Sequence, residues 1–171
     1  MVFRGSLTPL DWFRDFLAIP HELADHPQLG DVHAGFAIGM DDALGNLLPR
    51  LRNSVYVTGH SLGAARATIF SGLLMAIAKP PVARVVFGEP RSGCARLSSI
   101  VRRISRNASY RNVWGGSVDL VTTVPTDPPY KRATPLTDVH EQPKAFDSWG
   151  LLARHHLGLY AKAVGVEGID I

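Results

Sequence analysis

Apolar segments and turn-forming segments alternate along the chain in a strand-then-helix order. Residues 54–58 are β-branched and aromatic and predict a strand, which a helix over 62–78 follows. A second strand is predicted over 82–87, a helix over 95–106 and a third strand over 110–114. Strands that alternate with helices in this way predict an α/β fold, with a mostly parallel sheet covered by helices on both faces.

The remaining segments frame this central unit. Apolar residues recur at helical spacing over residues 36–51 and, more briefly, over 7–17, and both stretches predict amphipathic helices. A last helix is predicted over 149–164. Residues 18–31 and 125–143 are rich in turn formers and predict loops. Neither repeats nor a low-complexity linker divide the chain, so we expect one domain over residues 1–171.

Composition narrows the class of protein without identifying it. Hydrophobic residues make up 46% of the 171 positions and charged residues 19%, which is typical of a globular domain. The net charge of +3 is too small to indicate a nucleic-acid partner. The single cysteine, Cys94, excludes a disulfide within the chain. Neither a signal peptide nor a membrane span is recognisable, so we expect a cytoplasmic protein unless the chain is a fragment of a secreted one.

The strongest chemical signal is the pentapeptide Gly59-His60-Ser61-Leu62-Gly63. It lies directly between a predicted strand and a predicted helix, where a serine on a sharp turn is exposed as a nucleophile. Small neighbours are needed at such a turn, and the two glycines meet that need. The N–H group of Leu62, the residue after the nucleophile, is a natural donor to a developing oxyanion. We therefore predict that Ser61 is the nucleophile of a serine hydrolase.

A serine nucleophile needs a histidine base and a carboxylate that orients it. In this type of fold the acid and then the histidine follow the serine in sequence. Asp119 is favoured because it comes after the strand at 110–114, at the carboxyl edge of the sheet where such sites lie. The other acids after Ser61 are Glu89, Asp127, Asp138, Glu141 and Asp147. His140, His155 and His156 are the candidate bases, and the residues alone leave that choice open.

Five segments, taken together, resemble the class 3 lipases, the fungal-type triacylglycerol lipase family with an α/β-hydrolase fold. The resemblance extends from residue 3 to about residue 160. In chain order the segments are Phe3-Arg4-Gly5-Ser6, Val32-His33-Ala34-Gly35-Phe36, the Ser61 pentapeptide, Phe87-Gly88-Glu89-Pro90-Arg91-Ser92-Gly93, and Asp119-Leu120-Val121 with Pro125.

The resemblance implies a carboxylic ester hydrolase that acts on an ester or lipid substrate without a cofactor. It selects Asp119 as the acid and implies Ser6 as the second oxyanion-hole residue. The spacing to Tyr160 resembles the family's HxxxxY segment and favours His155 as the base, with His156 as the alternative. Residues 7–17 correspond to the position of a lid, which would contact a lipid interface; a fixed helix packed on the core is the other interpretation.

One departure from the family pattern affects the interpretation. Family members have further strands before the first motif, so we expect a minimal domain or one shortened at its N-terminus. The strand at Val2-Phe3 would then have an uncovered edge, which favours a homo-oligomer. A catalytically inactive module that binds a lipid or a partner protein is the alternative function. His21, His26 and His33 are predicted as solvated loop residues, because no ligand spacing around them indicates a metal site.

Overall fold

A mostly parallel sheet forms the centre of the fold. The computed structural model describes residues 1–4, 19–143 and 150–166, and for 150–152 the backbone alone. Four parallel strands lie in the order β1 (Val2–Phe3), β4 (Tyr56–His60), β5 (Ala83–Phe87) and β6 (Arg106–Trp114). Strand β6 also pairs with β8 (Leu136–Val139) in parallel and with β7 (Ser117–Val118) in antiparallel orientation. The central strands are those that the sequence predicts.

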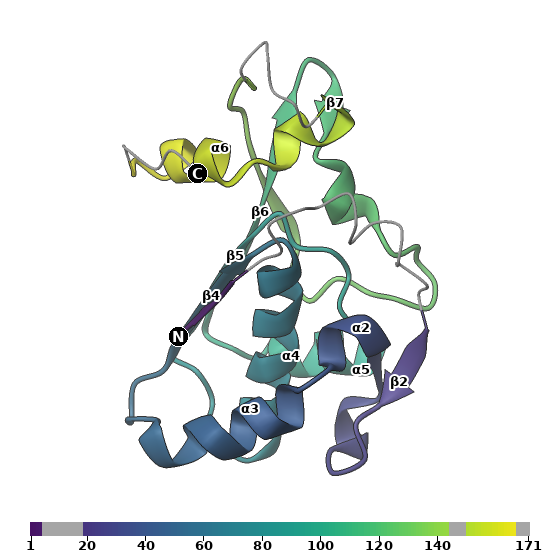
Figure 1. Ribbon diagram of the computed structural model, residues 1–171, viewed down its shortest axis with the longest axis vertical. Coiled ribbons are helices and arrows are strands. Elements are labelled where there is room, and N and C mark those ends of the chain that lie inside the picture. Colours follow the sequence, from purple (N-terminus) through teal and green to yellow (C-terminus); the bar gives the residue numbers. More distant parts are fainter. Residues whose placement is uncertain (5–18, 144–149, 167–171) are drawn as a thin grey trace.

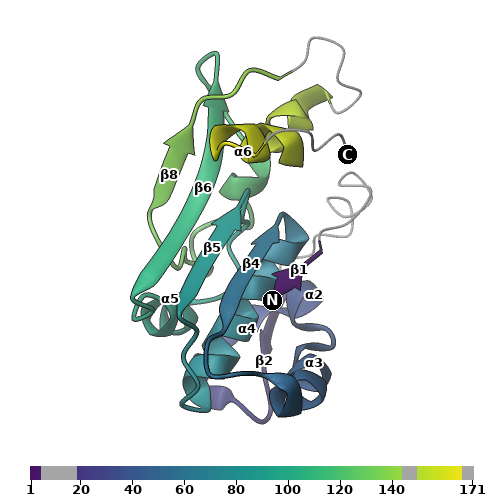
Figure 2. The ribbon, with the colours of Figure 1, turned by 90° about the vertical axis from the view of Figure 1, so that its left-hand side faces the viewer.

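Helices lie on both faces of this sheet, as predicted. On one face are α2 (Ala34–Ala37), α3 (Met40–Leu47), α4 (Leu62–Ala76) and α5 (Ala95–Val101). On the other face α6 (Leu157–Ala163) lies over one end of the strands (Figures 1 and 2). Short 3₁₀ turns complete the described elements: η1 (Pro27–Leu29), η2 (Leu48–Arg50), η3 (Leu120–Thr123) and η4 (Gly150–His155).

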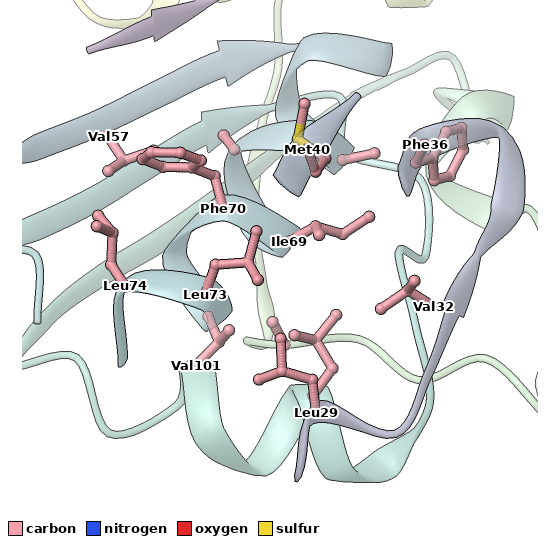
Figure 3. Close-up of a cluster of buried hydrophobic side chains, with 14 of the residues drawn as sticks. Leu29, Val32, Phe36, Met40, Val57, Ile69, Phe70, Leu73, Leu74 and Val101 are labelled. Atoms are coloured by element: carbon pink, nitrogen blue, oxygen red, sulfur yellow. The ribbon is translucent and has the colours of Figure 1, made fainter. Parts of the chain in front are cut away.

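The core lies between the sheet and the layer formed by helices α2 to α5, and α4 runs through its middle. Ile69, Phe70, Leu73 and Leu74 of this helix are all fully buried. They pack against side chains from β4 and from the segments before it, such as Val57, as Figure 3 shows. Helix α4 is apolar on nearly every side because it packs against the sheet and against helices at once. This packing fixes the N-terminus of α4, directly after Ser61, against the end of β4.

Several element boundaries differ from those predicted. The helix expected over 36–51 is broken by Gly39, which has a left-handed φ of +72°. The loop expected over 125–143 contains strand β8. The last helix is two pieces, η4 and α6, which meet at the two adjacent histidines 155 and 156.

The segment predicted as a loop before residue 31 contains regular structure. Strand β2 (Pro20–Glu22) pairs in antiparallel orientation with β3 (Asp31–His33) and forms a separate two-stranded sheet. The predicted lid or helix over 7–17 lies outside the described residues. In the described part of the chain, none of the helices combines the length and apolarity needed to cross a membrane.

Candidate active site

Ser61 sits on a strained turn between β4 and α4, as the pentapeptide predicts. Its backbone angles are φ +59° and ψ −129°, a conformation that a non-glycine residue rarely adopts. Such strain typically costs about 1–3 kcal/mol and persists only where the surroundings hold it in place. The Ser61 N–H donates to the carbonyl oxygen of Phe87 on the neighbouring strand at 3.1 Å, and the Ser61 carbonyl accepts from Ala64 and Ala65 in α4.

The two glycines of the pentapeptide are needed because other backbone atoms approach them closely. A Cβ atom on Gly59 would lie 2.3 Å from the carbonyl oxygen of Gly63. A Cβ atom on Gly63 would lie 2.1 Å from the carbonyl oxygen of Phe3 in β1. Both distances are far below van der Waals contact, and rigid backbone cannot yield to them. The glycines therefore permit α4 to start directly against β4 and β1.

The start of α4 offers the donor that an oxyanion would need. Leu62 is the first residue of α4, so its N–H has no partner within the helix. The positive end of the helix dipole lies at the same place. Ser6, the other residue predicted for the oxyanion hole, lies outside the described residues.

Asp119 is positioned by a tight hairpin. Gly115 and Gly116, both with positive φ (+59° and +74°), reverse the chain between β6 and β7. Asp119 then follows β7 and donates its N–H to the Asn112 carbonyl at 2.9 Å. Its side chain is fully buried, and its Oδ1 accepts from the Val121 N–H at 3.0 Å, which caps η3. The hairpin and the cap together fix the direction of the carboxylate.

The structure brings Asp119 and His155 together, although 36 positions separate them in the sequence. His155 Nδ1 lies 2.7 Å from Asp119 Oδ2, and both side chains are 0% exposed. The other ring nitrogen, Nε2, is buried and has no hydrogen-bond partner in the described part of the chain, so it is not bonded to Ser61. Catalytic hydrogen bonds are often long in a free enzyme and tighten when substrate binds. The pair has the arrangement of an oriented base with one nitrogen left for proton transfer.

The alternative bases are engaged elsewhere. His156 is the N-cap residue of α6, where its Nδ1 accepts from the Gly158 N–H at 3.3 Å. His140 is exposed, and its Nδ1 lies 3.1 Å from the Val113 carbonyl oxygen. Of the three candidate bases, His155 has the direct contact with the predicted acid.

The other candidate acids also have partners that account for them. Glu89 is buried and forms an ion pair with Arg84 at 2.5 Å. It also accepts from Ser109 at 3.1 Å and from Ser92 at 3.3 Å. The three remaining described acids, Asp127, Asp138 and Glu141, form ion pairs with Lys131, Arg111 and Lys162. Asp147 lies outside the described residues.

Three further residues contact the Asp119–His155 pair. Tyr160 donates its hydroxyl to Asp119 Oδ2 at 2.5 Å and accepts the Asn112 N–H at 3.0 Å. Burial and then the Asp119 charge raise the pKa of Tyr160 well above 10, so the hydroxyl keeps its proton. The ring of His60 stacks on that of His155, with centroids 4.6 Å apart.

Gly88 is the third of these residues. It has a φ of +56°, and a Cβ atom there would lie 2.7 Å from His155 Cε1 and 3.0 Å from Asp119 Oδ2. The family segment around residues 87–93 and the spacing to Tyr160 were visible in the sequence, but neither indicated a contact with the acid. Those contacts arise from the packing of β5 and α6 against the end of β6.

One histidine differs from its predicted environment. His33, expected in a solvated loop, is 3% exposed and stacks on Phe36 with centroids 4.2 Å apart. Burial lowers the pKa of His33 to about 4. Strand β3 causes the difference, because it pairs with β2 and packs beside the core instead of remaining a loop. Among the described residues, no group of three or more His, Cys, Asp or Glu side chains could hold a metal ion.

The comparison with known families decides the assignment. The model of the family "Lipase (class 3)" matches residues 1–128, about three quarters of the chain. The chain belongs to the class 3 lipase family. The assignment agrees with the five motifs and with the sheet and elbow described above, and the chain has the α/β-hydrolase fold. Among curated proteins, no relative matches the sequence.

Solved structures of lipases share the fold. The MDLA protein of Penicillium cyclopium, in a mutant form, is 24% identical with a TM-score of 0.68, over 87% of this chain and 57% of its own. The mono- and diacylglycerol lipase of Aspergillus oryzae is 22% identical with a TM-score of 0.63, over 86% and 54%.

A third structure, of a triacylglycerol lipase, is described as having a serine protease triad as its catalytic centre. It is 24% identical with a TM-score of 0.56, over 75% of this chain and 52% of its own. The chain thus spans about half the length of these structures.

Proposed function

We propose that this class 3 lipase hydrolyses carboxylic esters of lipids through an acyl-enzyme intermediate. Ser61 is the nucleophile, His155 the general base and Asp119 the residue that orients the base. The observation that carries the proposal is the buried Asp119–His155 pair, which leaves Nε2 of the imidazole without a partner among the described residues. The strained backbone of Ser61 supports the nucleophile role, because strain of this kind concentrates at functional sites.

Ser61, His155 and Asp119 each have a distinct role in the two half-reactions, acylation and deacylation. Ser61 Oγ attacks the ester carbonyl carbon while His155 Nε2 takes the hydroxyl proton. The tetrahedral intermediate collapses, the C–O bond to the alcohol breaks, and His155 returns the proton to the leaving oxygen. Water then attacks the acyl-enzyme with His155 as base again, which releases the acid and restores Ser61. Asp119 keeps the proton of the neutral ring on Nδ1 and stabilises the imidazolium that forms in each step.

The negative charge of each intermediate needs donors that point at the oxyanion. The Leu62 N–H at the start of α4 supplies one, reinforced by the helix dipole. We assign the second donor to Ser6 and a lid that contacts the lipid surface to residues 7–17, both from the resemblance to the family. The related structures include a triacylglycerol lipase and a mono- and diacylglycerol lipase, which supports an acylglycerol as the substrate class.

A panel of p-nitrophenyl esters from C2 to C16 tests the function. The wild type should hydrolyse several members, and Ser61→Ala should lose activity by about 10⁴-fold or more, as triad deletions do. The circular dichroism spectrum of Ser61→Ala should match that of the wild type, because the substitution removes only one hydroxyl group. A folded wild type that hydrolyses no ester would support the alternative function, an inactive module that binds a lipid or a protein.

We also propose that the edge of β1 is covered by a second copy of the chain. Strand β1 pairs with β4 on one side, and its other side has no partner strand among the described residues. Nearby, Val2 is 77% exposed and Tyr56 is 55% exposed. Unpaired strand edges favour association. Sedimentation velocity over a range of concentrations should show a species heavier than 18.6 kDa, whereas one sharp species at that mass throughout would exclude the oligomer.

A further inference from the structure

The residue before the nucleophile contacts the residue proposed as the base. His60 is the last residue of β4, and its ring lies on the α6 side of the sheet, away from α4. The ring of His60 stacks on the ring of His155, with centroids 4.6 Å apart and an interplanar angle of 28°. It also lies 5.6 Å from the ring of Tyr160, between centroids. Residues 60 and 155 thus meet across the boundary between the sheet and the last helical segment.

A hydrogen bond accompanies this stacking. His60 Nε2 lies 2.7 Å from the backbone carbonyl oxygen of His155. A carbonyl oxygen only accepts, so Nε2 of His60 carries the proton and donates it. Burial, and next the neighbouring His155, lower the pKa of His60 well below 6.5. The His60 ring is therefore neutral at neutral pH, with its one proton directed at the backbone of residue 155.

We propose that His60 is a positioning residue that fixes the segment carrying the base relative to the nucleophile. Ser61 follows His60 directly, and Phe87 on the next strand accepts the Ser61 N–H. The same strand end therefore places the nucleophile and holds the main chain of the base. His155 is then held at two points, its Nδ1 by Asp119 and its carbonyl by His60. This role rests on the proposed function, because it acts on the geometry of the Ser61–His155 proton transfer.

The other explanation is that His60 only fills space between the sheet and α6. Phenylalanine would keep the aromatic stacking but lose the donor, and glutamine would lose the ring but place an amide N–H near the position of Nε2. A packing role predicts that His60→Phe works better than His60→Gln. A positioning role predicts the reverse order. The two variants therefore separate the hydrogen bond from the packing.

Steady-state kinetics on a short p-nitrophenyl ester provides the first measurement. Displacements of about 1 Å in a catalytic constellation cost about 10²-fold in rate. We expect His60→Phe to lower kcat by about 10- to 100-fold with KM within about threefold of wild type, and His60→Gln to recover most of kcat. If His60→Phe does not melt cooperatively, His60→Leu takes its place as the variant without a donor. A kcat within twofold of wild type without the donor, or no recovery in His60→Gln, would overturn the proposal.

A second measurement needs no turnover. In the Ser61→Ala background, NMR follows solvent exchange of the His155 Nδ1 proton, which Asp119 holds. Loss of the His60 hydrogen bond should speed this exchange by about tenfold or more in His60→Phe, and His60→Gln should restore slow exchange. If the chain hydrolyses no ester but shows this pattern, the proposed function fails, but the hydrogen bond from His60 to the His155 backbone still holds the base segment in place. If the wild type is active and exchange is equal in all three proteins, the role of His60 fails alone.

Discussion

The two halves of the candidate active site are built in different ways. The nucleophile elbow, residues 59–63, is local: strand, turn and helix follow one another in the chain. The acid–base half consists of Gly88, Asp119, His155 and Tyr160. Gly88 directly follows β5, Asp119 lies between β7 and η3, His155 ends η4, and Tyr160 lies in α6. A short motif can encode the first half, because backbone sterics act between neighbours. The second exists only when distant elements pack correctly, and so substitutions that contact no substrate should weaken it.

The largest expected effect distinguishes the two adjacent histidines. His155→Ala removes the group bonded to Asp119 and should lower kcat/KM by about 10⁴-fold or more. His156→Ala removes the N-cap of α6 and should cost about 1 kcal/mol of stability with activity within about tenfold of wild type. Kinetics and thermal melting of both variants test this. The reverse ranking of activity would make His156 the base and remove His155 from the acid–base half.

Gly88→Ala should give the next largest effect. The new methyl group would meet the His155 ring at 2.7 Å and so displace the pair by several tenths of an ångström or more. We expect kcat to fall by about 10²-fold. Gly39→Ala is the matched control, because Gly39 has a similar positive φ of +72° and nothing within 4 Å of the added Cβ. Equal kcat in both variants would show that backbone strain, and not collision with the acid–base half, is responsible.

This contrast also explains how far the sequence could be interpreted. The class of fold, the elbow and the positions of Ser61 and Leu62 follow from the alternation of strands and helices and from the sterics of two glycines. Asp119 follows from its place after a strand. The choice of His155 over His156 rested on the spacing to Tyr160, because adjacent residues have the same local pattern.

Other features could not be predicted because they depend on contacts between distant residues. Strand β8 lies in a stretch rich in proline, and its pairing with β6 is stabilised by tertiary packing rather than by local preference. His33 is buried through the pairing of β3 with β2. The contact of Gly88 with His155 joins residues 67 positions apart, so a single sequence contains no local sign of it.

Tyr160→Phe should have a smaller effect that identifies the role of the hydroxyl. The variant removes a donor to Asp119 Oδ2 and the acceptor of the Asn112 N–H. A carboxylate with one donor fewer stabilises the imidazolium more strongly, so the acidic limb of the pH–rate profile should move to higher pH by about half a unit. We expect kcat to fall about 3- to 10-fold. A lower melting temperature with an unmoved acidic limb would limit Tyr160 to a structural role.

The smallest expected effect concerns stability in acid and the histidine that joins the two halves. The folded protein lowers the pKa of His60 well below 6.5 and that of His33 to about 4. In the unfolded chain both imidazoles bind a proton near pH 6.5, whereas in the folded chain they are still neutral at that pH. The two groups therefore contribute their full stability above pH 6.5 and lose it as the pH falls below 6.5, for His33 over the range down to about 4.

Urea unfolding at several pH values between about 7.5 and 4.5 measures this loss, which should be about 1–3 kcal/mol for His33 and should have the same sign for His60. His33→Gln should flatten the pH dependence with little change in kcat, because the ring of His33 packs on the rings of Phe36 and Tyr130. His60→Gln should flatten it too, but only this variant changes a group that is bonded to the backbone of His155. Stability that is constant or rises as the pH falls would contradict the burial of both rings. Equal kcat in His33→Gln and His60→Phe would mean that His60 does not position the base.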